Sequence, residues 1–202
     1  MKNLILIGAG GHCVSCIDVI EKENKFKIFG LIDKKQFKNP YYKIVGNDKD
    51  LKKIFSKVQN ALITLGQIEQ FHLRKKLFSE AKKIGFKFPT IISPLAYVSK
   101  KAFVDEGTIV MHGAIINAGA KIGKNCIINS KALVEHDAKI GNNSHVSTRS
   151  TLNGGAIVGN NCFIGSHSVV KQNIKIENNS FVNANLFINK NIKNNSKIYE
   201  KK

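Results

Sequence analysis

The chain has 202 residues, of which 43% are hydrophobic, so it is long enough to bury one large core or two smaller ones. Its net charge of +18 comes mostly from lysines that stand singly or in pairs, without a basic helix that carries interleaved aromatic residues, and this argues against a nucleic-acid partner. Because the sequence contains neither a run of about 18 apolar residues nor a signal-peptide cleavage site, we expect no membrane insertion and a cytoplasmic location.

The first part of the chain alternates short apolar runs with segments of helical periodicity. In chain order these are a strand at 3–7, a glycine-rich turn, a helix around 14–20, a strand at 26–33, a helix at 48–57, a strand at 61–65 and a helix at 69–84. Such alternation favours a parallel sheet with helices on its faces. The sequence therefore predicts a small Rossmann-like α/β domain over residues 1–88.

The turn after the first strand carries a partial dinucleotide-binding motif. Gly8 and Gly10 match its first two glycines, but Cys13 stands at the third glycine position, which weakens the case for a nicotinamide cofactor. A glycine-rich turn at a helix N-terminus, including Gly11, still favours a phosphate, because free N–H groups point at the ligand. Asp33, at the end of the second strand, could bind a base or ribose, or could simply cap the following turn.

A six-residue repeat occupies the second part of the chain. Seventeen consecutive positions six residues apart, from Ile92 to Ile188, are all Ile, Val or Leu, and a small residue precedes the aliphatic one by two positions from Ala96 to Ser168. A longer period of eighteen residues relates the segments 121–126, 139–144, 157–162 and 175–180. Three short strands per coil, with Gly and Asn in the turns, predict a parallel β-helix over residues 89–202.

These features together resemble a known family. A short α/β domain that opens with Gly8-Ala9-Gly10-Gly11-His12 is joined through 91–94 to hexapeptide coils that carry Glu135-His136-Asp137. This arrangement resembles the NeuD-like sugar O/N-acyltransferases of sialic-acid loci and bacillosamine pathways, over nearly the whole chain. The resemblance implies a left-handed β-helix, a homotrimer, acetyl-CoA as co-substrate and no metal. Family members usually end in glycine-rich coils, whereas this chain ends in a Lys/Asn-rich tail.

The resemblance also implies roles for particular residues. His136 matches the catalytic base, Asp137 the acid that steadies it, and Asn129 a position near the substrate amine. The residues that match the remaining positions fall into two sets: His145, Gly154, Gly155 and Ser166 for the acetyl-CoA, and Gly8, Gly10, Gly11, His12, Asp33, Gly66 and Arg74 for the nucleotide sugar.

The expected chemistry is direct acetyl transfer from a thioester to the amino group of a nucleotide-activated amino sugar. An imidazole next to a carboxylate suits the base role near neutral pH, and the thiolate of coenzyme A leaves without a covalent enzyme intermediate. His136 and His145 are nine residues apart, which is half of an eighteen-residue coil. Within one chain they should lie on different sides of the prism, so they can share a site only across subunits.

Three other functions remain possible at this point. The same base would serve O-acetylation of a sialic-acid-like (nonulosonic) sugar. A zinc carbonic anhydrase needs imidazoles stacked on adjacent coil edges, but no two of the histidines between positions 72 and 167 are separated by a multiple of eighteen residues. A non-catalytic nucleotide-sugar sensor or assembly scaffold would leave His136 without a role.

Overall fold

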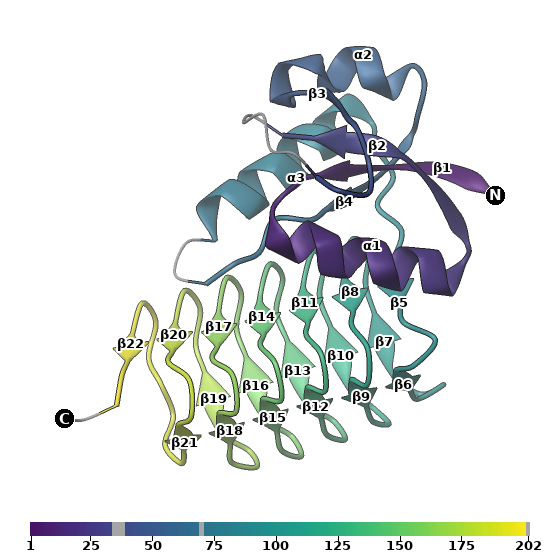
Figure 1. The fold of residues 1–202 in the computed structure, drawn as a ribbon. Coiled ribbons are helices and arrows are strands. Elements are labelled where there is room, and N and C mark those ends of the chain that lie inside the picture. Colours follow the sequence, from purple (N-terminus) through teal and green to yellow (C-terminus); the bar gives the residue numbers. More distant parts are fainter. Residues whose placement is uncertain (34–38, 69–70, 201–202) are drawn as a thin grey trace.

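The computed structural model describes residues 1–33, 39–68 and 71–200 and divides into an α/β part and a β-helix (Figure 1). The α/β part contains β1 (Lys2–Ile7), α1 (Gly11–Glu23), β2 (Phe26–Ile32), β3 (Ile44–Gly46), a 3₁₀ turn (Asp48–Asp50), α2 (Leu51–Phe55), β4 (Asn60–Ile63) and α3 (His72–Ile84). Its four strands are parallel, in the order β3-β2-β1-β4. The expected parallel α/β domain is thus confirmed.

Two details differ from the sequence-based expectation. β3 was not expected, because it is a three-residue edge strand that is half exposed and carries no clear apolar alternation. α3 begins at His72 rather than at residue 69, and residues 69 and 70 lie outside the described part of the chain. Helix ends are the least predictable feature of a sequence pattern.

Strand β1 is buried on both faces, as is usual for a parallel sheet that is covered by helices. Leu4 and Leu6 pack with the apolar side of α1, whereas Ile5 and Ile7 pack with residues of α2 and α3. Successive side chains of a strand point to opposite faces, so a continuous apolar run supplies both cores.

The remaining strands, each two residues long, form a prism with three parallel sheets. The seven-stranded sheet contains β5 (Ile91–Ile92), β8 (Ile109–Val110), β11 (Ile127–Ile128), β14 (His145–Val146), β17 (Phe163–Ile164), β20 (Phe181–Val182) and β22 (Lys197–Ile198). The six-stranded sheet contains β6 (Tyr97–Val98), β9 (Ile115–Ile116), β12 (Leu133–Val134), β15 (Thr151–Leu152), β18 (Val169–Val170) and β21 (Phe187–Ile188). The five-stranded sheet contains β7 (Phe103–Val104), β10 (Lys121–Ile122), β13 (Lys139–Ile140), β16 (Ile157–Val158) and β19 (Lys175–Ile176).

The prism is built as the repeat predicted. The second residue of each strand points inward, and from Val110 to Ile188 these aliphatic side chains form one continuous buried core. The small residues that precede them are buried from Thr108 to Ser168, because they occupy the tight interior corners. Asparagines such as Asn143 and Asn161 take positive φ angles of 55° and 58° in the turns, a conformation that Asn adopts more easily than most residues.

The α/β part rests on the first coils of the seven-stranded sheet (Figure 1). The outward side chains of Ile91, Ile109 and Ile127 are buried in the same cluster as the apolar residues of α1. At the edge of this contact, His112 makes two hydrogen bonds. Its Nε2 atom lies 2.6 Å from the Asp18 carboxylate of α1, and its Nδ1 atom lies 2.6 Å from the Ser93 hydroxyl. The outer face of this sheet thus shares one apolar core with α1, and this core holds the α/β part against the prism.

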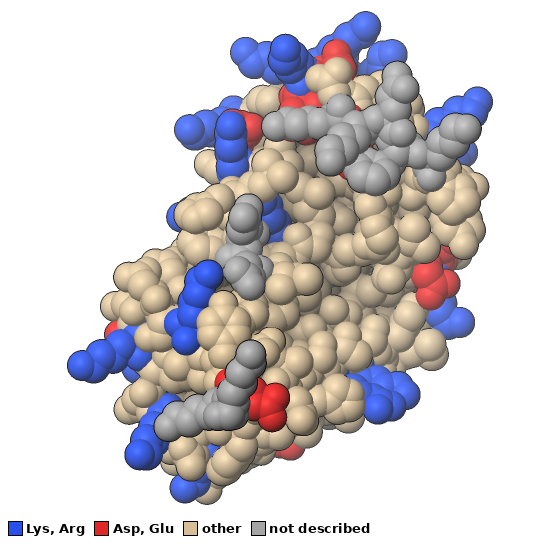
Figure 2. Space-filling view, turned by 60° about the vertical axis from the view of Figure 1, so that its left-hand side comes forward, with Lys and Arg blue, Asp and Glu red and all other residues tan. Residues whose placement is uncertain are grey.

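None of the described helices is long and apolar enough to span a membrane. On the face shown in Figure 2, the lysines are spread around the periphery of the molecule rather than gathered in one basic patch. This agrees with the distribution of single and paired lysines along the sequence.

Candidate active site

His136 and Asp137 lie in the turn between β12 and β13, at the corner where the six-stranded sheet meets the five-stranded sheet. The His136 Nδ1 atom is 2.9 Å from the Asp137 carboxylate, and both side chains are about two-thirds exposed, at 66% and 72%. This hydrogen bond, with the nearby charge of Asp137, raises the pKa of His136. Because Nδ1 donates to Asp137, the lone pair of a neutral ring lies on Nε2.

The neighbouring coils fix the position of this pair. A Cβ on Gly154, one coil further on, would come within 2.6 Å of His136 Nε2, so the ring packs directly on the backbone there. On the previous coil, a Cβ on Gly119 would collide with the Asp137 carboxylate. The two glycines therefore leave the space that the His136 and Asp137 side chains occupy.

A groove opens beside the His136 ring. It is lined by residues of three successive turns at the same corner: Glu135, His136, Asp137, Asn153, Gly154, Gly155, Gln172 and Asn173. Gly155 has a φ of +67°, and a Cβ there would collide with the Asn173 side chain. The groove is polar and open, so an extended ligand can lie along it.

Three residues expected near the acetyl-CoA or the substrate amine lie at or beside a different corner of the prism from His136 in the same chain. His145 is on β14 of the seven-stranded sheet, while Asn129 and Ser166 lie in turns between this sheet and the six-stranded sheet. The whole six-stranded sheet separates them from His136. The expectation that His136 and His145 lie on different sides of one prism is therefore confirmed.

His145 is buried under the α/β part. Its Nδ1 atom donates to the carbonyl of Gln67 at 2.5 Å, and its Nε2 atom accepts from the Asn129 amide at 3.1 Å. Burial and the nearby Arg74 lower the pKa of His145 to about 4, although the Gln67 carbonyl acts in the opposite direction. The ring is therefore neutral at pH 7, and it orients Asn129.

The residues expected to bind the nucleotide sugar gather at the carboxyl ends of β1, β2 and β4. Gly8 has a φ of +112° and packs against Leu65, whereas a Cβ on Gly10 or Gly11 would meet no atom of the described residues within 4 Å. No described side chain therefore caps the N-terminus of α1, where Gly10 is the N-cap residue. Asp33 accepts a hydrogen bond from the backbone N–H of Ala9 at 2.7 Å.

His12, in the first turn of α1, lies beside Gly66. Its Nε2 atom is buried and makes no hydrogen bond within the described part of the chain. Burial, together with the nearby Arg74 and His145, lowers the pKa of His12 to about 3. The imidazole of His12 is therefore neutral at pH 7, and its buried Nε2 atom has no hydrogen-bond partner among the described residues.

Arg74 is fully buried; its Nε and Nη1 atoms donate to the backbone, whereas its buried Nη2 atom has no partner among the described residues. Its guanidinium donates to the carbonyls of Ile63, Leu65 and Asn125, which join the end of β4 to a turn of the β-helix. This position explains how Arg74 holds the two parts together. A direct contact with the substrate, expected from the resemblance, stays a prediction.

Gln67, within the family-like Gly66-Gln67-Ile68 segment, was given no role from the sequence, and Asn117 was not singled out. Gln67 donates to the Asn143 carbonyl at 2.9 Å, and Asn117 donates to the Glu135 carboxylate at 2.9 Å. Gln67 joins parts far apart in the sequence, so no local pattern reveals it. Asn117 and Glu135 are eighteen residues apart, and the coil period could have paired them.

Three families of known domains match the chain. The PglD N-terminal domain matches residues 3–81, the bacterial transferase hexapeptide matches 119–154 and 137–172, and the hexapeptide repeat of succinyl-transferase matches 155–190. The chain therefore carries a PglD N-terminal domain followed by hexapeptide repeats of the bacterial transferase type. The expected resemblance and the left-handed β-helix are thereby confirmed, and the protein is an enzyme of the acyltransferase type. No curated protein sequence matches it.

Solved structures match nearly the whole chain. PerB from Caulobacter crescentus, in complex with CoA and GDP-perosamine, is 28% identical, with 95% of this chain and 91% of that chain covered and a TM-score of 0.89. A histidine-to-asparagine mutant of perosamine N-acetyltransferase from the same organism, also with CoA and GDP-perosamine, is 27% identical, with 96% and 91% covered and a TM-score of 0.91. The acetyltransferase domain of PglB from Neisseria gonorrhoeae is 24% identical, with 98% and 96% covered and a TM-score of 0.91, a likeness that shows the shared fold.

Proposed function

We propose that the protein is an acetyl-CoA-dependent N-acetyltransferase that acts on the amino group of a nucleotide-activated sugar. The observation that carries this proposal is the hydrogen bond of 2.9 Å between His136 and Asp137, at an open groove floored by Gly154. The likeness to a perosamine N-acetyltransferase that binds CoA and GDP-perosamine, over 96% of this chain, supports the substrate class. In this reading residues 1–88 bind the nucleotide sugar and residues 89–202 carry the transfer.

His136 acts as the general base. Asp137 holds Nδ1 protonated, so that Nε2 accepts the proton of the incoming amine as nitrogen attacks the thioester carbonyl. The thiolate of coenzyme A then leaves, and no acyl-enzyme intermediate is needed. The backbone at Gly154 and Gly155 carries no side chain that would keep the thioester oxygen at a distance.

The complete site needs a second subunit. The outer surface of the six-stranded sheet exposes Tyr97, Ile115 and Phe187 at 59%, 41% and 62%, an apolar stripe suited to association with other copies. In a homotrimer packed through this sheet, the His136 corner of one subunit would meet the corner of the next that carries Asn129 and Ser166. Asn129, held by His145, would then orient the acceptor amine, and Ser166 would contact the acetyl-CoA.

The α/β part holds the nucleotide. The open N-terminus of α1 at Gly10 and Gly11 suits a diphosphate, since the first N–H groups and the helix dipole favour negative charge. Asp33 would bind the ribose or the base, and His12, in the first turn of α1, would lie on the sugar side. Gly66 lies beside His12, where an added Cβ would make ordinary contact at 3.5 Å.

A substrate panel tests this function directly. The protein is incubated with acetyl-CoA and either nucleotide-linked 4-amino sugars or free nonulosonic acids, and the release of thiol is followed. Turnover with an amino sugar that is lost in His136→Ala supports the proposal. Turnover with the nonulosonic acids alone would instead assign O-acetylation. Full activity of His136→Ala would show that His136 is not the general base.

A further inference from the structure

The turns on one side of the six-stranded sheet carry a column of basic residues. Lys131, Arg149 and His167 lie on successive coils, in the turns that lead from the seven-stranded sheet to the six-stranded sheet, and all three are exposed. Each takes a positive φ angle, of 58°, 57° and 59° in this order. Because they follow one another at the coil period, these three residues, called the basic column below, stack along the prism.

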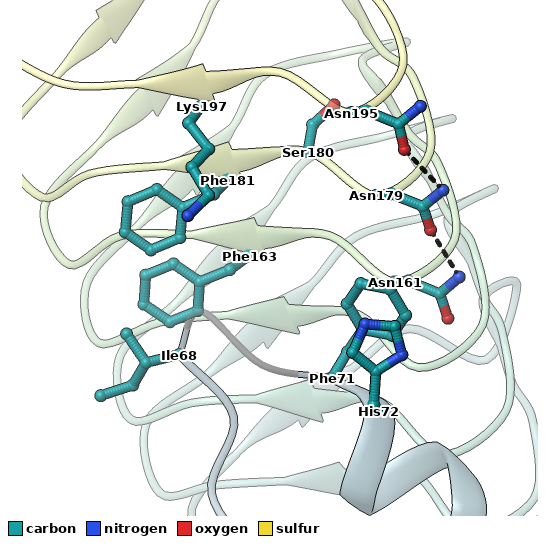
Figure 3. Close-up of a pocket in the computed structure, with 10 residues that line it drawn as sticks. All are labelled: Ile68, Phe71, His72, Asn161, Phe163, Asn179, Ser180, Phe181, Asn195 and Lys197. Carbon is teal, nitrogen blue, oxygen red and sulfur yellow. Dashed lines mark hydrogen bonds between the residues drawn. The ribbon is translucent and has the colours of Figure 1, made fainter.

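The corresponding position at another corner shows which residue this turn favours. At the corner drawn in Figure 3, Asn161, Asn179 and Asn195 take positive φ angles of 58°, 58° to 56° and 59° at their ends and middle, and their amides form a hydrogen-bonded column. Asparagine adopts this conformation more easily than lysine or arginine, whose side chains cannot form such a column. Stacked like charges also repel one another. The basic column therefore costs stability, which points to a function at this corner.

The turns on the other side of the same sheet carry the complementary charge. Of the described residues in the six-stranded sheet and the turns on its two sides, only Glu135 and Asp137 are acidic, and we call 135–137 the acidic turn. One oxygen of Glu135 accepts from the Asn117 amide, and one oxygen of Asp137 accepts from His136. The second oxygen of each carboxylate makes no hydrogen bond among the described residues. The basic column likewise forms no ion pair within the described part of the chain.

The basic column and the acidic turn lie at matching heights along the prism. Lys131 precedes Asp137 by a third of an eighteen-residue coil, and Arg149 follows it by two-thirds. Because neighbouring coils stack about 4.8 Å apart, Asp137 lies about 1.6 Å above Lys131 and about 3.2 Å below Arg149. Within one chain the six-stranded sheet separates these residues. In a homotrimer whose axis runs along the prism, the heights are the same in every subunit, so the two corners can meet between subunits.

We propose that the basic column of one subunit lies against the acidic turn of the next, with Lys131 and Arg149 on either side of Asp137. The inference rests on the shared site proposed above, to which it adds two cations from the neighbouring subunit. These cations bind the carboxylate oxygens that are not hydrogen-bonded within the chain, and they fix the turn that carries His136.

Few charged groups face His136 within its own chain. The acidic turn supplies Glu135 and Asp137, whereas the corresponding turns of the coils before and after, 117–119 and 153–155, are uncharged. Lys139, which begins the next strand, is exposed on the five-stranded sheet. Because a nearby positive charge disfavours the imidazolium, cations from the next subunit would oppose the effect by which Asp137 raises the pKa of His136.

The protonation of His136 tests this contact. In Lys131→Gln/Arg149→Gln the ring should keep its proton to higher pH, so kcat/KM should fall about threefold more on the acid limb of its pH profile than on the plateau. A purely structural defect would lower limb and plateau by the same factor. NMR titration of ¹³C-labelled histidine, assigned with His136→Ala, follows the same change without turnover. Lys52→Gln/Lys53→Gln on α2 removes the same charge from the α/β part and is the matched control.

Cross-linking tests the geometry separately. All four cysteines are buried, so a Glu135→Cys/Arg149→Cys variant presents only its two new thiols to a short bismaleimide. Covalent dimers and trimers are expected on a denaturing gel. Glu135→Cys/Lys52→Cys is the control and should give none.

Two results would overturn the proposal: no cross-linked species, or a titration of His136 that Lys131→Gln/Arg149→Gln leaves unchanged. A basic column that binds a free anion instead would give both. Sedimentation and turnover of the wild type separate this inference from the proposed function. An active trimer with either negative result loses only this contact, whereas a monomeric wild type would remove the shared site as well.

Discussion

The imidazole of His136 rests on the backbone of Gly154, one coil further along, so closely that a Cβ on residue 154 would come within 2.6 Å of Nε2. Gly154→Ala is therefore expected to push the ring out of position and to lower kcat by about 100-fold, the size of effect that a displacement of about 1 Å in a catalytic group produces. Steady-state kinetics measure this loss. Thermal unfolding is the control and should change little, since residue 154, unlike Gly155, does not need a positive φ. Wild-type kcat in this variant would show that the ring position is not critical.

The pH dependence of activity should follow the His136–Asp137 pair. Asp137 raises the pKa of His136, and only the neutral ring can accept a proton, so activity falls as the pH drops through this raised pKa. In Asp137→Asn the pKa of His136 should return toward its ordinary value, which moves the acid limb of the kcat/KM profile to lower pH. The plateau should also fall, because the ring loses the partner that orients it. Asp105→Asn, a carboxylate in a different turn, serves as the control. If the acid limb of Asp137→Asn lies at the same pH as in the wild type, the limb does not report the protonation of His136.

A site shared between subunits predicts complementation. His136→Ala and Asn129→Ala should each be nearly inactive as pure proteins, since each removes one half of every site. When the two are unfolded together and refolded, about a quarter of the sites in randomly mixed trimers would carry both intact residues. Activity should recover to about that share. If the mixture stays as inactive as its components, the two residues do not act at a common site.

The regular parts of this fold could be predicted because each depends on a local pattern. The aliphatic residues from Val110 to Ile188 repeat every six positions, and that period alone determines where each strand and corner lies. Strand β3 could not be predicted in the same way. It consists of three half-exposed residues that pair with β2, so its existence depends on a neighbour distant in the sequence.

In the candidate site, too, some residues could be predicted from local patterns and others depend on contacts between distant parts of the chain. The resemblance and the repeat pointed to His136, Asp137 and Gly154, which the structure brings together at one corner. The position of Arg74 was not foreseeable, because a buried guanidinium that joins β4 to a coil turn depends on how the two parts are docked. Local patterns predict elements and their repeats, whereas contacts between the two parts come only with the tertiary structure.

Arg74→Met tests the assignment of Arg74 to this contact between the two parts. The change removes charge-assisted hydrogen bonds to three carbonyls and leaves these acceptors buried, so we expect the free energy of unfolding to fall by about 3 kcal/mol. Chemical denaturation measures the loss, and Lys75→Met on the same helix is the control. A stable Arg74→Met protein with a raised KM for the nucleotide sugar would instead favour the direct substrate contact.

The buried His145 should make the stability of the protein sensitive to acid. Its pKa is lowered to about 4 in the folded protein, from an ordinary value of 6.5, so the unfolded chain binds more protons between these two values. Stability is therefore complete above pH 6.5 and falls as the pH drops toward 4, by about 3 kcal/mol for this group. His145→Gln cannot titrate, so its free energy of unfolding should fall less between pH 7 and pH 5 than that of the wild type. Equal losses in the two proteins, measured by urea unfolding at both pH values, would show that protonation of His145 does not limit stability.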